Sequence, residues 1–293
     1  MNYGFIPTPT TSTDYFAGGI LGLPYQEVIP TGDWSPYLPA DEFQNGGIET
    51  MACVSFSANN SVETQLNRYL IEDLIPDNII EQFTQLGYIN GGLFNFSDRF
   101  LAKMSGTTPN GNTMPNVWSA IRHYGLPSEA DWPGAWSSWA DYYKGVPTGV
   151  KSKALRFLDY FTVQYEYLAN NSRLEMNTAK YNLKQAPIQV ATAVCAGWSN
   201  APVVLRCETP VEHATLIYNV DDFYNDFDSY APYRKKLAGD YLIPYAMKGL
   251  VIPKFNIKKN YMSKLLRKTN TREVFLVLNG KRYWVKDLAN FED

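Results

Sequence analysis

The chain has 293 residues, of which 45% are hydrophobic and 19% charged, a composition typical of a folded protein and not of a disordered one. A formal net charge of −3 argues against nucleic acid as a partner. No apolar run approaches the roughly 20 residues of a membrane span, so no membrane contact is expected. The first residues have neither a basic stretch nor an apolar core, so the sequence predicts no signal peptide and synthesis in the cytoplasm.

Residues 1–40 are rich in proline, threonine and glycine and show no sustained hydrophobic period. Prolines recur too often for a helix, at Pro7, Pro9, Pro24, Pro30, Pro36 and Pro39. The pattern predicts an extended arm. Such an arm must lie on its own domain or reach a neighbouring subunit to be ordered.

The next hundred residues are predicted to be mainly helical. Helices are expected over residues 51–70, 96–104, 114–124 and, as a short one, within 135–144. Thr50 is the expected N-cap of the first helix, and Ser97 or Asn95 that of the second. Gly125 is expected to end the third.

The following hundred residues are predicted to be mainly β-structure. Strands are expected over residues 161–168, 187–194, 203–207, 213–220, 240–246 and 248–252. One helix, over residues 174–185, interrupts them. Together the strands would form an antiparallel set.

Residues 254–293 look separate from the rest. They hold ten Lys or Arg and four Asp or Glu, a net charge of +6. Residues 273–285 predict two strands joined at Asn279 and Gly280, a dipeptide that favours a hairpin with a type I′ turn. A unit this small must pack on the main domain or on a partner.

One cysteine and one histidine stand out for their positions. Cys53 opens the first helix, and His213, one of only two histidines, begins a strand 160 residues later. A helix N-terminus and a neighbouring imidazolium both favour the reactive thiolate. The other histidine, His123, lies near a helix end, where it can face the carbonyl groups in a structural role. Cys195 and Cys207 could pair with each other, although two ordinary buried thiols are the expectation.

Six short segments extend this pattern along the chain. They lie at residues 95–106, 125–133, 185–191, 212–214, 228–230 and 239–243. In this order they resemble the second helix, the turn after it, the "GP-V-x-V-A" strand, the "D/N-H-A" and "N-S-W" motifs and the last "GY" strand of the papain-like cysteine peptidases. The altered flanks of Cys53 also resemble divergent papain-like proteins encoded by bacteriophages.

The resemblance implies an α+β, papain-like two-lobed fold, with a helical left lobe and an antiparallel, β-barrel-like right lobe. We expect the arm at residues 1–40, the papain-like domain at 41–253 and a basic β-hairpin module at 254–293. The helical lobe would cover about 50–150 and the β lobe about 155–253. The hairpin module is not part of the papain fold.

The resemblance also assigns roles to single residues. Cys53 would be the nucleophile, and His213 would be the base that takes its proton. Asp228 would orient the His213 ring, a place where the family has Asn. Gln44 would donate to the oxyanion, but it lies nine residues before Cys53, whereas the family spacing is six. Tyr230 stands where the family has Trp and can still shield the Asp228–His213 bond from water.

These roles predict a thiol-dependent hydrolase that cleaves peptide or isopeptide bonds through an acyl-enzyme, with a protein or peptide as substrate. The acidic residues at 221–228 match no calcium-binding loop, so neither a metal nor a cofactor is expected. The alternatives are a structural virion or assembly component on a papain-like scaffold, with or without residual activity, and a cell-wall peptide amidase. Residues 1–40 and 254–293 are candidates for docking to a larger, virion-like protein assembly. The arm is short and lacks a helical pattern, which argues against the inhibitory prosegment that family enzymes often carry.

Overall fold

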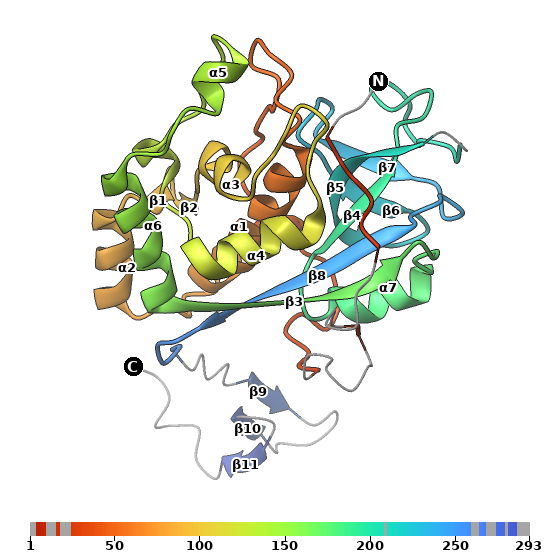
Figure 1. Ribbon diagram of the computed structural model, residues 1–293. Coiled ribbons are helices and arrows are strands. Elements are labelled where there is room, and N and C mark those ends of the chain that lie inside the picture. The colour runs from red at the N-terminus through yellow and green to blue at the C-terminus, as the bar shows by residue number, and fades with distance from the viewer. Residues whose placement is uncertain are drawn as a thin grey trace.

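The structure, a computed structural model, describes residues 4–9, 16–17, 25–207 and 210–258, together with the backbone of three strands between 264 and 285. Helices gather on one side of the molecule and an antiparallel sheet on the other, with the long helix α1 (Cys53–Ile71) between them (Figure 1). This is the α+β, two-lobed arrangement expected from the sequence.

The sheet has six strands, and every neighbouring pair in it is antiparallel. The strands are β3 (Phe161–Asn170), β4 (Ile188–Ala193), β5 (Val211–Val220), β6 (Tyr224–Phe227), β7 (Arg234–Leu237) and β8 (Tyr245–Pro253). Their order is β3-β8-β4-β5-β6-β7, and α7 (Met176–Leu183) connects β3 to β4. Within the described residues the sheet is open, with β3 and β7 at its ends, so the expected barrel-like closure is not formed.

Two expected strands are wrong in whole or in part. Residues 203–207 contribute only an isolated bridge from Val204 to Leu237. Residues 240–244 form a loop, and the strand begins at Tyr245, directly after Pro244, which has no N–H to donate to a ladder. The short strands β6 and β7 were not expected.

The helical lobe confirms two predicted caps and corrects a third. Its other elements are α2 (Asp77–Gln85), the hairpin of β1 (Ile89–Asn90) and β2 (Leu93–Phe94), α3 (Asp98–Met104), α4 (Met114–Tyr124), α5 (Trp139–Tyr142) and α6 (Thr148–Tyr160). The Ser97 side chain caps α3 by accepting from the Phe100 N–H, and Gly125, with a φ of 68°, ends α4. Thr50 does not cap α1, because its hydroxyl donates to the Gln44 carbonyl at 3.0 Å.

Helix α1 is buried from Cys53 to Asn67 because it packs on both lobes, against α3 and α4 on one side and β5 and β8 on the other. Gln189 of β4 ties the lobes together. Its side-chain amide donates to the Val54 carbonyl and to the Ser57 hydroxyl, each at 2.8 Å, and its oxygen accepts from the Trp118 indole at 2.8 Å. The start of α1 is therefore held in place from the sheet and from α4.

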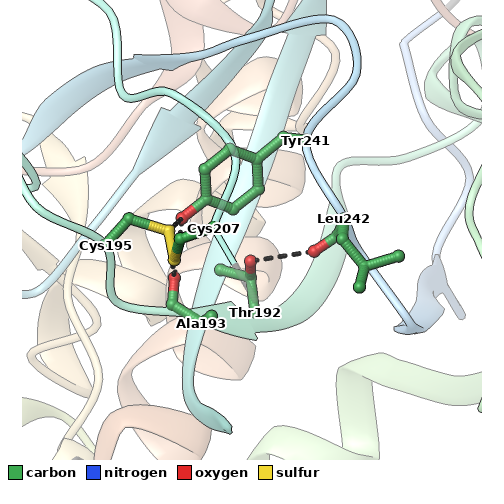
Figure 2. The surroundings of a disulfide bond; sticks show 6 residues. All are labelled: Thr192, Ala193, Cys195, Cys207, Tyr241 and Leu242. Carbon is green, nitrogen blue, oxygen red and sulfur yellow. Dashed lines mark hydrogen bonds between the residues drawn. A yellow bond between two sulfur atoms is a disulfide. The ribbon is translucent and has the colours of Figure 1, made fainter. Parts of the chain in front are cut away.

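Cys195 and Cys207 form a disulfide, which corrects the expectation of two separate thiols. The Tyr241 hydroxyl lies 2.8 Å from the Cys195 sulfur and donates to the Ala193 carbonyl at 2.7 Å (Figure 2). The bond closes the loop between β4 and β5. Cys53 is the free cysteine.

The C-terminal residues contain a three-stranded antiparallel sheet of β9 (Lys264–Arg267), β10 (Val274–Leu278) and β11 (Lys281–Val285). The predicted pairing of the last two strands is present, with Leu278 opposite Lys281. The predicted turn at Asn279 and Gly280 lies outside the described residues.

Candidate active site

Cys53 lies at the first position of α1 and is fully buried. Its sulfur accepts a hydrogen bond from the backbone N–H of Ala214, the residue after His213, at 3.4 Å. Burial raises the pKa of the Cys53 thiol, and the N–H of Ala214 only partly offsets this. The negative charges of Asp228 and Glu49 raise it further. Burial therefore favours the thiol form of Cys53 over the thiolate.

His213 and Asp228 form a buried hydrogen-bonded pair at the neighbouring end of β5. His213 Nε2 lies 2.7 Å from Asp228 Oδ1, and both side chains are fully buried. The second oxygen, Oδ2, accepts from the Trp198 indole at 2.8 Å and from the Lys235 ammonium at 2.7 Å. Burial alone would raise the pKa of Asp228, but the charges and hydrogen bonds of His213 and Lys235 outweigh it and lower the pKa to about 2. The low pKa keeps Asp228 as a carboxylate that is hydrogen-bonded to the His213 ring.

Tyr230 packs beside the histidine. Its ring centroid lies 5.6 Å from that of His213, and Trp198 faces the ring of His213 at 5.8 Å. The two aromatic side chains enclose the His213–Asp228 pair. The other histidine, His123, lies on α4 with its Nδ1 2.7 Å from the Ser119 carbonyl, away from this pair.

Gln44 reaches the site, but its amide is engaged. Its Nε2 donates to Glu49 Oε1 and to the Tyr230 hydroxyl, each at 2.8 Å, and its Oε1 accepts from the Ser229 hydroxyl at 2.8 Å. Glu49 Oε1 also accepts from the Met51 N–H at 3.0 Å. A carboxylate oxygen therefore occupies the point where these two N–H donors converge. Nothing in the sequence indicates this position for Glu49.

The start of the arm lies across the junction of the two lobes. The Phe5 N–H donates to the carbonyl of Glu212, the residue before His213, at 3.1 Å. On the helical side, the Ile6 N–H donates to the Asn112 carbonyl at 2.8 Å, and the Asn112 N–H donates to the Gly4 carbonyl at 2.7 Å. The Phe5 side chain is buried in the same apolar cluster as Cys53.

Glycine is required at the two positions where the backbone of the arm lies closest to the backbone of the main domain. A Cβ atom on Gly4 would lie 2.2 Å from the Met51 carbonyl oxygen, and one on Gly111 would lie 2.0 Å from that of Gly4. The start of the arm thus runs between Asn112, with which Phe5 forms an isolated parallel bridge, and Glu212, and it lies against the segment just before Cys53. The sequence of the arm, which has no helical pattern, does not predict this position.

Lys235 and Trp198 are the site residues that sequence reasoning missed. Lys235 lies in a run of basic residues on β7 that reads as a solvated edge, yet it is 5% exposed. Trp198 lies in the loop that the disulfide closes. Exposed and buried residues alternate along β7 in the folded protein, but its sequence, Arg-Lys-Lys-Leu, has no alternation of polar and apolar side chains from which this could be predicted.

The described residues include no cluster of His, Cys, Asp or Glu with the arrangement of a metal site. A search of the same residues for a helix long and apolar enough to cross a membrane finds none.

The fold is that of papain-like cysteine proteases. No family model and no curated protein sequence matches the chain. Xylellain, a cysteine protease from Xylella fastidiosa, aligns with a TM-score of 0.56 and 13% identity over 84% of this chain and 94% of its own. Digestive procathepsin L 3 of Tenebrio molitor larval midgut aligns with a TM-score of 0.52 and 18% identity, over 85% of this chain and 76% of its own.

The proform of Amb a 11, a ragweed pollen cysteine protease, aligns with a TM-score of 0.51 and 16% identity. That alignment covers 74% of this chain and 65% of the ragweed chain. At such identities the similarity shows the fold and leaves the activity to be argued from the site.

Proposed function

We propose that the chain is a latent thiol hydrolase that cleaves peptide or isopeptide bonds through Cys53, His213 and Asp228. The observation that carries the proposal is the meeting of a cysteine at a helix N-terminus with a buried histidine–carboxylate pair, joined by the Ala214 N–H on the sulfur. Each of these features is what an activated thiol nucleophile needs.

In the proposed reaction His213 takes the thiol proton and the Cys53 sulfur attacks the carbonyl carbon of the scissile amide. The tetrahedral intermediate collapses to a thioester as the proton passes from His213 to the leaving nitrogen. Water, activated by the same imidazole, then hydrolyses the thioester. Asp228 orients the ring through both steps, and the amide of Gln44, once released by Glu49, would donate to the oxyanion.

A peptide substrate is supported by the segment that already lies between the two lobes. Gly4, Phe5 and Ile6 hydrogen-bond there through their backbone to Glu212 on one lobe and Asn112 on the other. An extended substrate could use the same main-chain groups, so arm and substrate would compete. We therefore expect the arm to suppress activity until it leaves.

A substitution in the arm tests this function. Phe5→Asp places a charge in a buried apolar site beside the Glu212 carbonyl, so it should release the arm. Pro7→Asp, at an exposed arm position, is the matched control. We expect Phe5→Asp to raise hydrolysis of a fluorogenic peptide library at least tenfold over both the wild type and the control. Adding Cys53→Ala should abolish this gain, and turnover that survives that change would refute the proposal.

The engaged Gln44 amide and the buried thiol favour one alternative, an assembly component on the same scaffold, such as a virion protein. That role predicts a stoichiometric particle whose formation is indifferent to Cys53→Ala, with no peptide cleaved by the Phe5→Asp variant. Including cell-wall peptides in the library tests the amidase alternative in the same experiment.

A further inference from the structure

Lys235 is a buried cation beside the histidine–carboxylate pair. Its side chain is 2% exposed and comes from β7, whereas His213 comes from β5. An ammonium group has three donor hydrogens, and the Lys235 Nζ has three oxygen partners. These are Asp228 Oδ2 at 2.7 Å, the Tyr230 carbonyl at 2.7 Å and the Pro232 carbonyl at 2.6 Å.

These bonds connect Lys235 to every candidate group of the right lobe. The bond to Asp228 fixes the carboxylate that holds His213, and the carbonyl bonds close the loop that carries Tyr230. Lys235 also lies 5.4 Å from the ring centroid of Trp198, whose indole donates to the same Asp228 oxygen. The two oxygens of the carboxylate thus have different partners. Oδ1 is hydrogen-bonded to His213, and Oδ2 accepts from Lys235 and Trp198.

The charge balance around His213 depends on this lysine. The titratable groups that interact with the pair are Asp226 from β6, Lys235 from β7 and Cys53 at the start of α1, and the ring of Tyr230 packs on His213. Burial raises the pKa of Asp226 to about 8, so Asp226 is neutral at neutral pH. Asp228 and Lys235 then form a pair with no net charge. Without Lys235, the full charge of Asp228 would act on the ring and hold it as imidazolium.

We propose that Lys235 is a positioning residue of the thiol site, which neutralises Asp228 so that the carboxylate orients His213 without locking the ring in its protonated form. The role in catalysis rests on the proposed function, whereas the electrostatic coupling can be measured without any activity. In the proposed reaction the ring takes the thiol proton and then gives a proton to the leaving nitrogen, so a ring held permanently as imidazolium could do neither at neutral pH.

The test is the protonation of His213 in the full chain, followed by NMR of 13C-labelled histidine. The chain has only two histidines, and a His123→Gln variant assigns their signals. In Lys235→Met we expect the midpoint of His213 protonation to rise by at least one pH unit, a tenfold gain in proton affinity. An unchanged midpoint in a folded Lys235→Met protein would overturn the proposal.

Lys248→Met is the matched control. Lys248 is a second buried lysine of the same sheet, and its partners include Glu166 at 2.8 Å and Asn182 at 2.8 Å, which lie outside the candidate site. Its loss should reduce stability in the same way as the loss of Lys235 but leave the His213 midpoint in place. A shift of equal size in both variants would assign Lys235 a merely structural role.

Because Lys235→Met leaves a buried carboxylate short of a partner, it can fail to fold. A second comparison, Asp228→Asn against Asp228→Asn/Lys235→Met, then decides. Removing the cation in the Asn background should again raise the midpoint, and equal midpoints would refute the coupling. If the midpoints move as expected but no variant hydrolyses peptides, the proposed function fails and the electrostatic role of Lys235 stands.

Discussion

At the scale of single residues, the site depends on the burial of its side chains and on the hydrogen-bond partners of their polar groups. Cys53 and His213 were recognisable from the sequence because a helix N-terminus and a strand start are local features. Asp228 was proposed only because residues 228–230 resemble the family's "N-S-W" motif. Glu49 was not recognisable, because one of its partners, Tyr230, lies far along the chain. Lys235 was not recognisable, because its partners Asp228, Tyr230 and Pro232 are brought to its ammonium group only by the folded loop between β6 and β7.

The proposed role of Gln44 as oxyanion donor can be tested by substitution. In the Phe5→Asp protein, Gln44→Ala should lower kcat about 10²-fold with little change in KM, because an oxyanion donor acts mainly in the transition state. Asn45→Ala, in the same loop, is the control and should retain activity. Steady-state kinetics on a cleaved peptide measures both, and equal rates for the two variants would remove Gln44 from the mechanism.

At the scale of elements, the sequence predicted best what local chemistry decides. Helix α4 (Met114–Tyr124) has the expected bounds because Thr113 caps it and Gly125 ends it. The expected strand at 203–207 failed because that segment belongs to a loop tied by the disulfide. β7 was missed because its four residues, three of them basic, are strand only through pairing with β6.

The disulfide loop gives the prediction for elements. Cys207→Ser should lower the free energy of unfolding by about 3 kcal/mol, the amount expected for a loop of roughly 12 residues. It should also loosen Trp198 and with it Asp228. Urea unfolding measures the stability, with Cys53→Ser, which keeps the disulfide, as the control. An unchanged midpoint in Cys207→Ser would mean that the bond does not stabilise the fold.

At the scale of the whole molecule, buried carboxyl groups link stability to pH. Burial raises the pKa of Asp226 and of Glu129, each to about 8. The folded state therefore holds protons that the unfolded state releases near pH 4. Their contribution to stability is present in full below the unfolded pKa values and is lost as the pH rises through about 8.

The melting temperature should accordingly fall by several degrees between pH 5 and pH 9. Asp226→Asn should flatten this slope, because the buried amide that replaces the carboxyl group has no proton to lose in this pH range. The exposed Asp222→Asn should leave the slope as it is. Parallel slopes for wild type and Asp226→Asn in scanning calorimetry would contradict the assignment.

The arm is the feature of the whole molecule that sequence reasoning could not place. Its position follows from hydrogen bonds to two lobes that are brought together only by folding, through Asn112 and Glu212. Those contacts are made by backbone groups, so they constrain few residue types in the arm. Gly4 and Phe5 are the exceptions.

We propose above all that Cys53 and His213 form an activated thiol site that the arm keeps closed. The most direct measurement is the pH dependence of Cys53 alkylation by iodoacetamide, read by mass spectrometry on wild type, Phe5→Asp and Phe5→Asp/His213→Ala. We predict no reaction below pH 7 in the wild type, rapid reaction there in Phe5→Asp, and loss of that reaction without His213. A Cys53 that reacts in all three proteins only as the pH nears the ordinary thiol pKa of about 8.5 would contradict the claim.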